Sequence, residues 1–139
     1  MGEIRLNVKL ENDGDLYLYK TGRLTYKEVK RLEVNALVDT GSVMVLLPQD
    51  MVEALGLIIV EKTIVTLANE EKIELEVAGM LSLTAYNRKM STDCLVGPPL
   101  CEPLVGQIVL ERLDLAIDPV RKTAAPRPES PFLPCLNLK

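Results

Sequence analysis

The chain has 139 residues, of which 47% are hydrophobic and 26% are charged, and its formal net charge is -4. This length suits a single domain with one core. The modest acidity gives no reason to expect nucleic acid or an anionic membrane surface as a partner. No apolar run reaches the roughly 18 residues of a membrane span, and the first residues lack the apolar core of a signal peptide. A cytoplasmic location is therefore expected.

The sequence contains no histidine and three cysteines, Cys94, Cys101 and Cys135. Without histidine, the Ser-His and Cys-His nucleophile systems and most zinc-hydrolase ligand sets are excluded. An odd number of cysteines without Cys-x-x-Cys spacing favours neither a disulfide framework nor a zinc site. The glycines are scattered and form no phosphate-binding loop. Hydrolysis would have to use carboxylates or an unusual lysine, and neither a metal nor another cofactor is expected.

Alternating apolar residues in the first part of the chain predict strands. The first strand is expected over 4–10, followed by a turn at Asn12-Asp13-Gly14 and a hairpin partner over 16–19. A second turn near Gly22 then leads to a strand over 32–38.

The next segment predicts a helix. Pro48 suits the first position of a helix and Gly56 suits its C-terminal cap, so a short helix is expected over 48–55. Alternation then returns and predicts a hairpin from 63 to 77 with a polar tip over 68–72. It continues over 81–85, and after a turn a further strand approaches Val96.

Helical spacing after Gly106 predicts a second short helix, which leads into a strand over 115–117. The rest of the chain is rich in proline and is expected to be an extended arm, partly disordered. The expected organisation is thus a domain over 1–119 with a C-terminal extension over 120–139.

A lone carboxylate, Asp39, follows an apolar strand and precedes Thr40-Gly41. An isolated charge at the end of a buried strand is costly unless it is paired or used. A turn-capping aspartate is the structural alternative. The segment 36–42 resembles the active-site signature of the aspartic proteases, specifically the single-lobe, retroviral-type enzymes and their bacterial relatives.

The resemblance covers roughly 30–119 and preserves the order of that family's parts. A strand, a turn and a polar-tipped hairpin follow the Asp-Thr-Gly, and then come Leu104-Val105-Gly106, a helix and Ile117-Asp118-Pro119. It implies a mainly β fold, the closed single-lobe acid-protease (retropepsin-like) β-barrel, with one or two short helices.

The resemblance also implies an aspartic endopeptidase that hydrolyses peptide or protein substrates as a homodimer. Two carboxylates close together cannot both ionise, so the pair holds one acid and one base at the same time. Between them a water is deprotonated while the substrate carbonyl is protonated. The chain has one Asp-Thr-Gly, so the second aspartate must come from a symmetric copy.

In this interpretation Asp39 is the catalytic residue. Gly41 allows the tight turn, and the resemblance implies that Thr40 hydrogen-bonds across to the opposite loop. Ser42 is expected to donate to the outer oxygen of Asp39.

The resemblance implies that Leu104, Val105 and Gly106 pack behind this loop. A competing match at 95–97 is less favoured because prolines follow it, whereas a helix follows the later copy. The polar hairpin tip would be the flap over the substrate. Its residues are Ala68, Asn69, Glu70 and Glu71.

A second function remains open, namely a dimeric binding or scaffold module with weak catalysis. It is favoured by the flap tip, which has Asn69-Glu70-Glu71 where many flaps have glycine. The acidic tip itself is expected to be a solvated turn. The four tyrosines are too dispersed in sequence to suggest stacking on bases.

Overall fold

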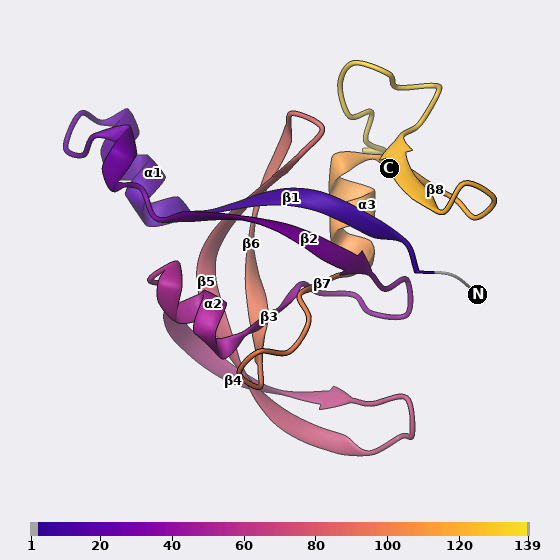
Figure 1. The fold of residues 1–139 in the computed structure, drawn as a ribbon, viewed down its shortest axis with the longest axis horizontal. Coiled ribbons are helices and arrows are strands. Elements are labelled where there is room, and N and C mark those ends of the chain that lie inside the picture. Colours follow the sequence, from indigo (N-terminus) through magenta and orange to yellow (C-terminus); the bar gives the residue numbers. More distant parts are fainter. Residues whose placement is uncertain (1–2, 139) are drawn as a thin grey trace.

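A computed structural model describes residues 3–138 of the chain, and Figure 1 shows its arrangement. Strands make up most of the ordered elements, with a few short helices between them. In chain order the elements are β1 (Arg5–Asn12), α1 (Asp13–Lys20), the 3-10 helix η1 (Tyr26–Glu28), β2 (Arg31–Val38), β3 (Leu46–Pro48), α2 (Gln49–Ala54), β4 (Ile58–Thr66), β5 (Lys72–Ala85), β6 (Arg88–Gly97), β7 (Leu104–Val105), α3 (Gln107–Leu113), β8 (Leu115–Asp118) and β9 (Thr123–Pro126).

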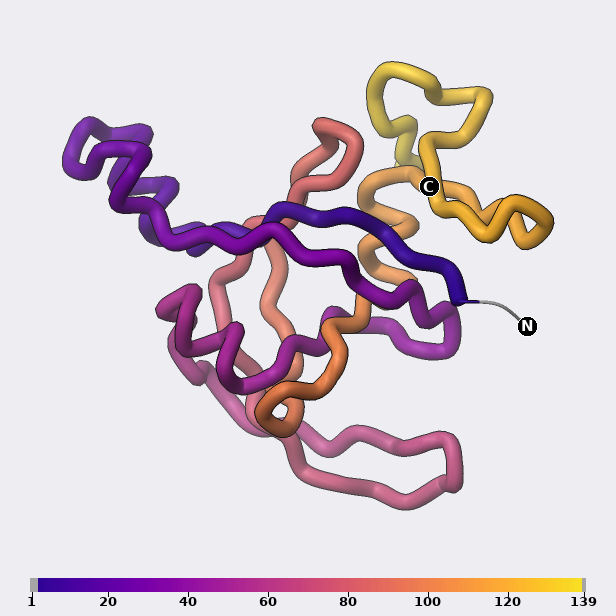
Figure 2. Tube along the Cα trace, viewed as in Figure 1, coloured from indigo at the N-terminus to yellow at the C-terminus, as the bar shows by residue number. Residues whose placement is uncertain are grey.

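The main sheet closes on itself. Its strand order is β1-β2-β7-β3-β6-β5-β4, and β1 also pairs with β5. This pairing joins the two sides of the sheet into a closed barrel, with β4 added at the outer edge of β5; Figure 2 follows the path of the chain through it. The predicted mainly β, closed single-lobe barrel is confirmed.

Alternation along the strands builds the core. Leu6, Val8 and Leu10 of β1 are buried, whereas the residues between them are more exposed. Their side chains pack with buried residues of β3, β5, β6 and α3 in one cluster. Burial of this apolar surface is the main driving force for closing the sheet.

The predicted helix after Pro48 and the predicted helix after Gly106 are both present, as α2 and α3. Gly56, with a φ of 64°, follows α2 as expected of a glycine at a helix end. The predicted hairpin is longer than its pattern indicated, because β4 begins at Ile58 and β5 continues to Ala85.

The predicted strand over 16–19 is wrong, because this segment is helical in α1. The Asn12 side chain accepts a hydrogen bond from the Asp15 amide at 3.0 Å and caps the helix. Acidic residues occupy the first turn and Lys20 the last, as the helix dipole favours. The partner of β1 is instead β2, with Glu11 opposite Arg31 at the near end and Arg5 opposite Leu37 at the far end.

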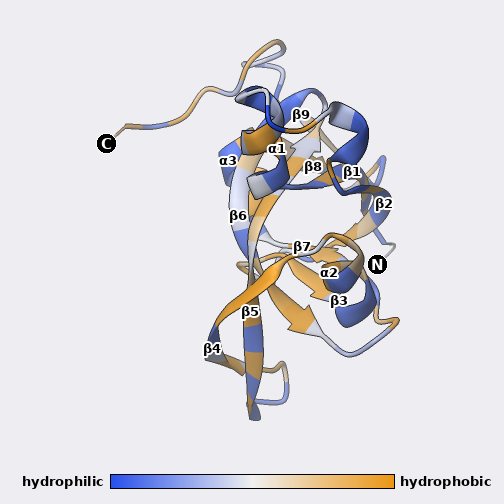
Figure 3. Ribbon diagram, turned by 90° about the vertical axis from the view of Figure 1, so that its left-hand side faces the viewer, coloured by the Kyte–Doolittle hydropathy of each residue, from blue (hydrophilic) through white to orange (hydrophobic). Residues whose placement is uncertain are grey.

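The proline-rich end of the chain is partly packed. β9 pairs with β8, and Ala124 is buried against the core. Beyond β9 the chain first packs against the end of α3, where Ser130 is buried, and its C-terminal end then points away from the body of the molecule, as Figure 3 shows. The predicted boundary at residue 119 stays a prediction, although the strand that follows it pairs with β8. Within residues 3–138, no helix is long and apolar enough to cross a membrane.

Candidate active site

Asp39 lies in the loop that follows β2. Its backbone amide donates to the Val105 carbonyl at 2.9 Å, which extends the pairing of β2 with β7 by one more hydrogen bond. The Ser42 amide donates to the Asp39 carbonyl at 3.1 Å and closes a tight turn. The loop is therefore held by backbone bonds on both sides of the carboxylate.

The carboxylate itself is only partly buried. Its Oδ1 atom accepts a hydrogen bond from the Gly41 amide at 3.0 Å. A Cβ added at Gly41 would lie 3.3 Å from that same oxygen, a tight contact. A small residue at position 41 thus brings the backbone close to the carboxylate.

The side chain of Ser42 differs from its expected role. Its hydroxyl donates to the Met44 carbonyl at 3.3 Å, and not to Asp39, whose Oδ1 atom already accepts from the Gly41 amide. Ser42 therefore supports the loop through its backbone and through Met44. The side chain of Thr40 is exposed in the single chain, as a residue that reaches toward a second loop must be.

Leu104, Val105 and Gly106 lie directly behind the loop. Leu104 pairs with Leu37 of β2 on one side and with Leu46 of β3 on the other, so β7 joins the strands that precede and follow the loop. The competing match at 95–97 lies in β6, where it pairs with β3 and not with β2. The structure thus places the later copy, and not the earlier one, behind Asp39.

Gly106 permits a very close backbone approach. A Cβ at this position would lie 2.5 Å from the Ser42 carbonyl oxygen and 2.7 Å from that of Met44. The first amides of α3 use this proximity, because Gln107 donates to Ser42 at 2.8 Å and Ile108 donates to Val43 at 3.0 Å. Amides that a helix start leaves unpaired are satisfied by the active-site loop.

Sequence analysis missed one contact of this loop. The Gln107 side chain donates to the Thr40 carbonyl at 3.1 Å and so ties α3 to the Asp-Thr-Gly turn. The only sequence signal for it is the polar residue directly after Gly106. A long-range contact of this kind needs the fold before it can be recognised.

The predicted flap residues form the tip of the β4–β5 hairpin, which projects from the barrel in Figures 1 and 3. The Glu70 amide donates to the Leu67 carbonyl at 2.9 Å, and the Leu67 amide donates to the Glu71 carbonyl at 2.7 Å. Glu70 has a φ of 67°, a conformation that glycine adopts most easily. Ala68 and Asn69 complete the tip, and all of these side chains are exposed.

Two further candidate chemistries are a thiol nucleophile at Cys94 and a metal site. Burial raises the pKa of the Cys94 thiol to about 12, with a further contribution from the charge of Asp93, so this thiol is no nucleophile at neutral pH. Within residues 3–138, no three His, Cys, Asp or Glu side chains are grouped to hold a metal ion. Asp39 remains the carboxylate that the fold presents on a supported, partly exposed loop.

Among solved structures, the chain is similar to the protease of EIAV in complex with the inhibitor HBY-793. The TM-score is 0.57 at 15% sequence identity, and the match covers 84% of this chain and 93% of that one. No protein-family model matches the sequence, and no curated protein matches it. The likeness establishes the fold, which is that of a single-lobe, retropepsin-like acid protease.

Proposed function

We propose that this chain is an aspartic endopeptidase whose active site forms where two copies meet. The observation that carries the proposal is Asp39 in an Asp-Thr-Gly turn, fixed from behind by β7 and the start of α3. The similarity of the barrel to a retroviral protease supports the same conclusion at the level of the fold. The expected kinship with bacterial relatives stays a prediction.

Each copy would supply one Asp39. Two such carboxylates across a twofold axis share a proton, because their mutual repulsion prevents both from ionising. The ionised member deprotonates a water, and the protonated member donates to the carbonyl oxygen of the scissile peptide bond. The exposed Thr40 side chain would hydrogen-bond with the other copy's loop and hold the two aspartates in register.

The substrate would be a peptide or an extended protein segment. The β4–β5 hairpin would cover the bound substrate, and β4 exposes apolar side chains that include Ile58, Val60 and Ile64. In Figure 3 part of the β4 ribbon has the colour of hydrophobic residues. A bound peptide and the second copy would cover such side chains, which otherwise face water at a cost.

The test is cleavage of a mixed peptide library across a range of pH, with the products identified by mass spectrometry. We expect a bell-shaped pH dependence, because one carboxylate must be ionised and the other protonated. The Asp39→Asn variant should lose cleavage while keeping its fold. Asp118→Asn is the matched control, since Asp118 accepts from the Val120 and Arg121 amides in a surface turn and should leave cleavage intact.

The alternative is a dimeric binding or scaffold module, and the flap tip favours it. Glu70 holds a glycine-like conformation with a large side chain, which restricts the movement of a cover that must open and close. Peptides that bind the wild-type chain without being cut at any pH would support this alternative. Cleavage by Asp39→Asn at the wild-type rate would make Asp39 a turn cap and exclude the proposed mechanism.

A further inference from the structure

The connection between β1 and β2 is far longer than the sheet requires. Antiparallel neighbours can be joined by a turn of about two residues, yet here α1 and η1 intervene between Glu11 and Arg31, the last paired positions. We call residues 13–31 the knob. In Figure 1 it stands out at one end of the molecule, where it adds no strand to the barrel.

The knob is built as a defined structure. Leu16 and Val29 are its buried apolar residues. Asp15 accepts hydrogen bonds from the backbone amide of Lys30 at 3.0 Å and from its ammonium group at 3.3 Å. Thr25 and Glu28 form a capping box at the start of η1. A segment fixed in this way presents its outer side chains in a stable arrangement.

Those outer side chains include three of the chain's four tyrosines. The rings of Tyr19 and Tyr26 are 5.3 Å apart, and the Arg31 guanidinium lies 4.3 Å from the centre of the Tyr26 ring. The Tyr26 hydroxyl donates to Glu11 at 3.0 Å. Tyr17 is 63% exposed on the same helix as Tyr19. Tyr19 and Tyr26, which are distant in sequence, therefore share one surface, whereas Tyr17, two residues before Tyr19 in α1, lies on another face of the helix.

This surface is also basic, although the molecule is acidic. The knob, residues 13–31, holds five Lys or Arg and three acidic residues, a formal charge of +2, whereas the other residues of the chain together carry -6. Lys20, Arg23 and Lys27 are exposed and form no ion pair within residues 3–138. Asp15, by contrast, forms an ion pair with Lys30.

We propose that the knob is a docking site for an acidic polypeptide segment that also carries apolar or aromatic side chains. Tyrosine and arginine are the residues that most often anchor protein interfaces, and three unpaired cations complement a run of carboxylates. The site is separate from Asp39, because β2 has eight residues and spans roughly 25 Å between the knob and that loop.

A nucleic acid fits this surface less well. Proteins that bind it can neutralise about 6–10 phosphates, whereas the knob has three cations that form no ion pair with the described residues, and the acidic remainder of the chain would repel a polyanion. An acidic peptide needs fewer cations and makes use of the tyrosines. The proposal does not depend on peptide hydrolysis, because docking is measured as binding.

The probe is a fluorescein-labelled peptide that alternates Glu with Leu and Tyr, and its control has Gln in place of every Glu. Binding is followed by fluorescence anisotropy with the full-length wild-type chain and with its Asp39→Asn variant. We expect both proteins to bind the Glu peptide, with affinity falling as salt is added, and to bind the Gln peptide much more weakly.

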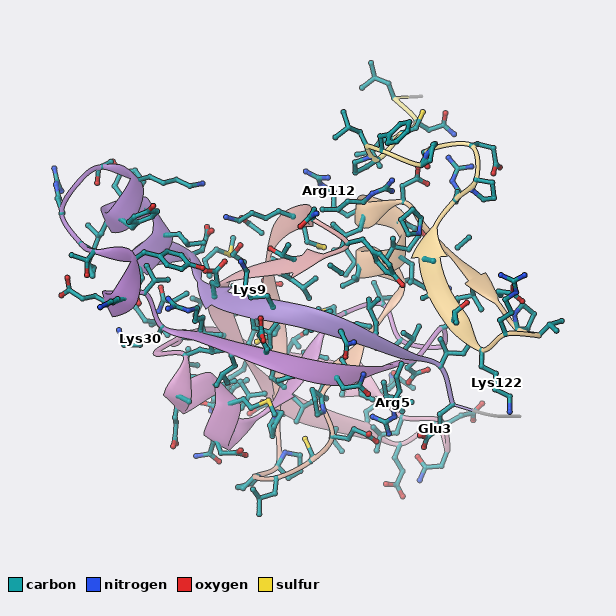
Figure 4. The ribbon with its side chains drawn as sticks, turned by 45° about the horizontal axis from the view of Figure 1, so that its top comes forward. Glu3, Arg5, Lys9, Lys30, Arg112 and Lys122 are labelled. Atoms are coloured by element: carbon teal, nitrogen blue, oxygen red, sulfur yellow. The ribbon has the colours of Figure 1, made fainter. Side chains whose placement is uncertain are left out.

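The variant Lys20→Glu/Arg23→Glu/Lys27→Glu should weaken binding by about tenfold or more, since three attractive contacts become repulsive. The matched control is Lys89→Glu/Arg112→Glu/Lys122→Glu, which makes the same change in net charge elsewhere. Figure 4 shows Lys30 near the knob, with Arg112 and Lys122 toward the other end of the molecule. This control should retain most of the affinity.

Tyr19→Ser provides an independent variant, because the Tyr19 ring is 42% exposed and lies beside Tyr26. It should weaken binding several-fold, with thermal unfolding measured to show that the variant stays folded at the assay temperature. Equal loss of affinity in both triple variants would show a general charge effect and overturn the proposal. Equal binding of the Gln peptide, or tighter binding of a single-stranded oligonucleotide, would overturn it as well.

Discussion

Gly106 lies directly behind the loop that carries Asp39, and there is no space for a side chain at this position. Alanine there would place a Cβ within 2.7 Å of backbone atoms of the Ser42–Met44 segment, so the loop or α3 must shift. We expect Gly106→Ala to lower the free energy of unfolding by about 2 kcal/mol or more, as measured by urea denaturation. Gly14→Ala in α1 is the control and should change it far less. Wild-type stability and activity in Gly106→Ala would contradict the close approach.

Glu70, at the tip of the β4–β5 hairpin, has a positive φ of 67°. A left-handed conformation costs a residue with a side chain about 1–2 kcal/mol. Glycine avoids this cost, but part of the gain is offset because glycine loses more conformational entropy on folding. We expect Glu70→Gly to raise the free energy of unfolding by up to about 1 kcal/mol. Glu71→Gly, at a position without positive φ, should lower it. Urea denaturation of both variants measures these free energies of unfolding. Changes of the same sign in Glu70→Gly and Glu71→Gly would contradict a specific backbone cost at Glu70.

At the scale of elements, Asp114 ties the C-terminal segment to the end of α3. Its carboxylate accepts hydrogen bonds from Arg127, from the Ser130 hydroxyl at 2.6 Å and from the Cys135 amide at 2.9 Å. The buried Arg88 guanidinium donates to the Leu113 and Ser130 carbonyls of the same region. The tail is thereby anchored by charge-assisted bonds, and not by a large apolar surface.

These bonds make the anchoring dependent on pH. Arg127, then the Ser130 hydroxyl and the Cys135 amide hold the pKa of Asp114 well below its usual range. Because the folded pKa is lowered, ionised Asp114 stabilises the fold above the ordinary aspartate pKa of about 3.9, and this contribution is lost as the pH falls below it. Asp114→Asn should therefore melt below wild type at neutral pH, and the two melting temperatures should converge in acid. A difference between the two melting temperatures that stays constant across pH would contradict the proposed role of the Asp114 charge.

Elements in which apolar residues recur at a regular spacing were predictable from the sequence, and the exceptions have physical causes. The strands of the barrel and the helices after Pro48 and Gly106 follow local patterns and local caps. Residues 16–19 alternate like a strand, but the Asn12 cap and the acidic first turn select α1. Those caps were readable signals. The anchoring by Asp114 depends on contacts across the fold, which no local pattern contains.

The same division applies to the candidate site. Asp39, Thr40 and Gly41 were recognisable because one tripeptide contains them, and the segment 104–106 followed from its order in the chain. The hydrogen bond of Ser42 with Met44, and that of Gln107 with Thr40, needed the three-dimensional loop. The proposed site requires a second Asp39, which one copy of the sequence does not contain.

At the scale of the whole molecule, the proposed activity requires two Asp39 residues acting together. The most direct measurement holds the wild-type concentration constant and adds increasing amounts of the Asp39→Asn variant, allowing subunits to exchange before peptide cleavage is measured. With equal amounts, random pairing leaves about half of the wild-type subunits with a wild-type partner, so activity should fall to about half, and further in excess variant. An inert protein added in place of the variant should have no effect. Activity that stays constant at every ratio would contradict a site shared between copies.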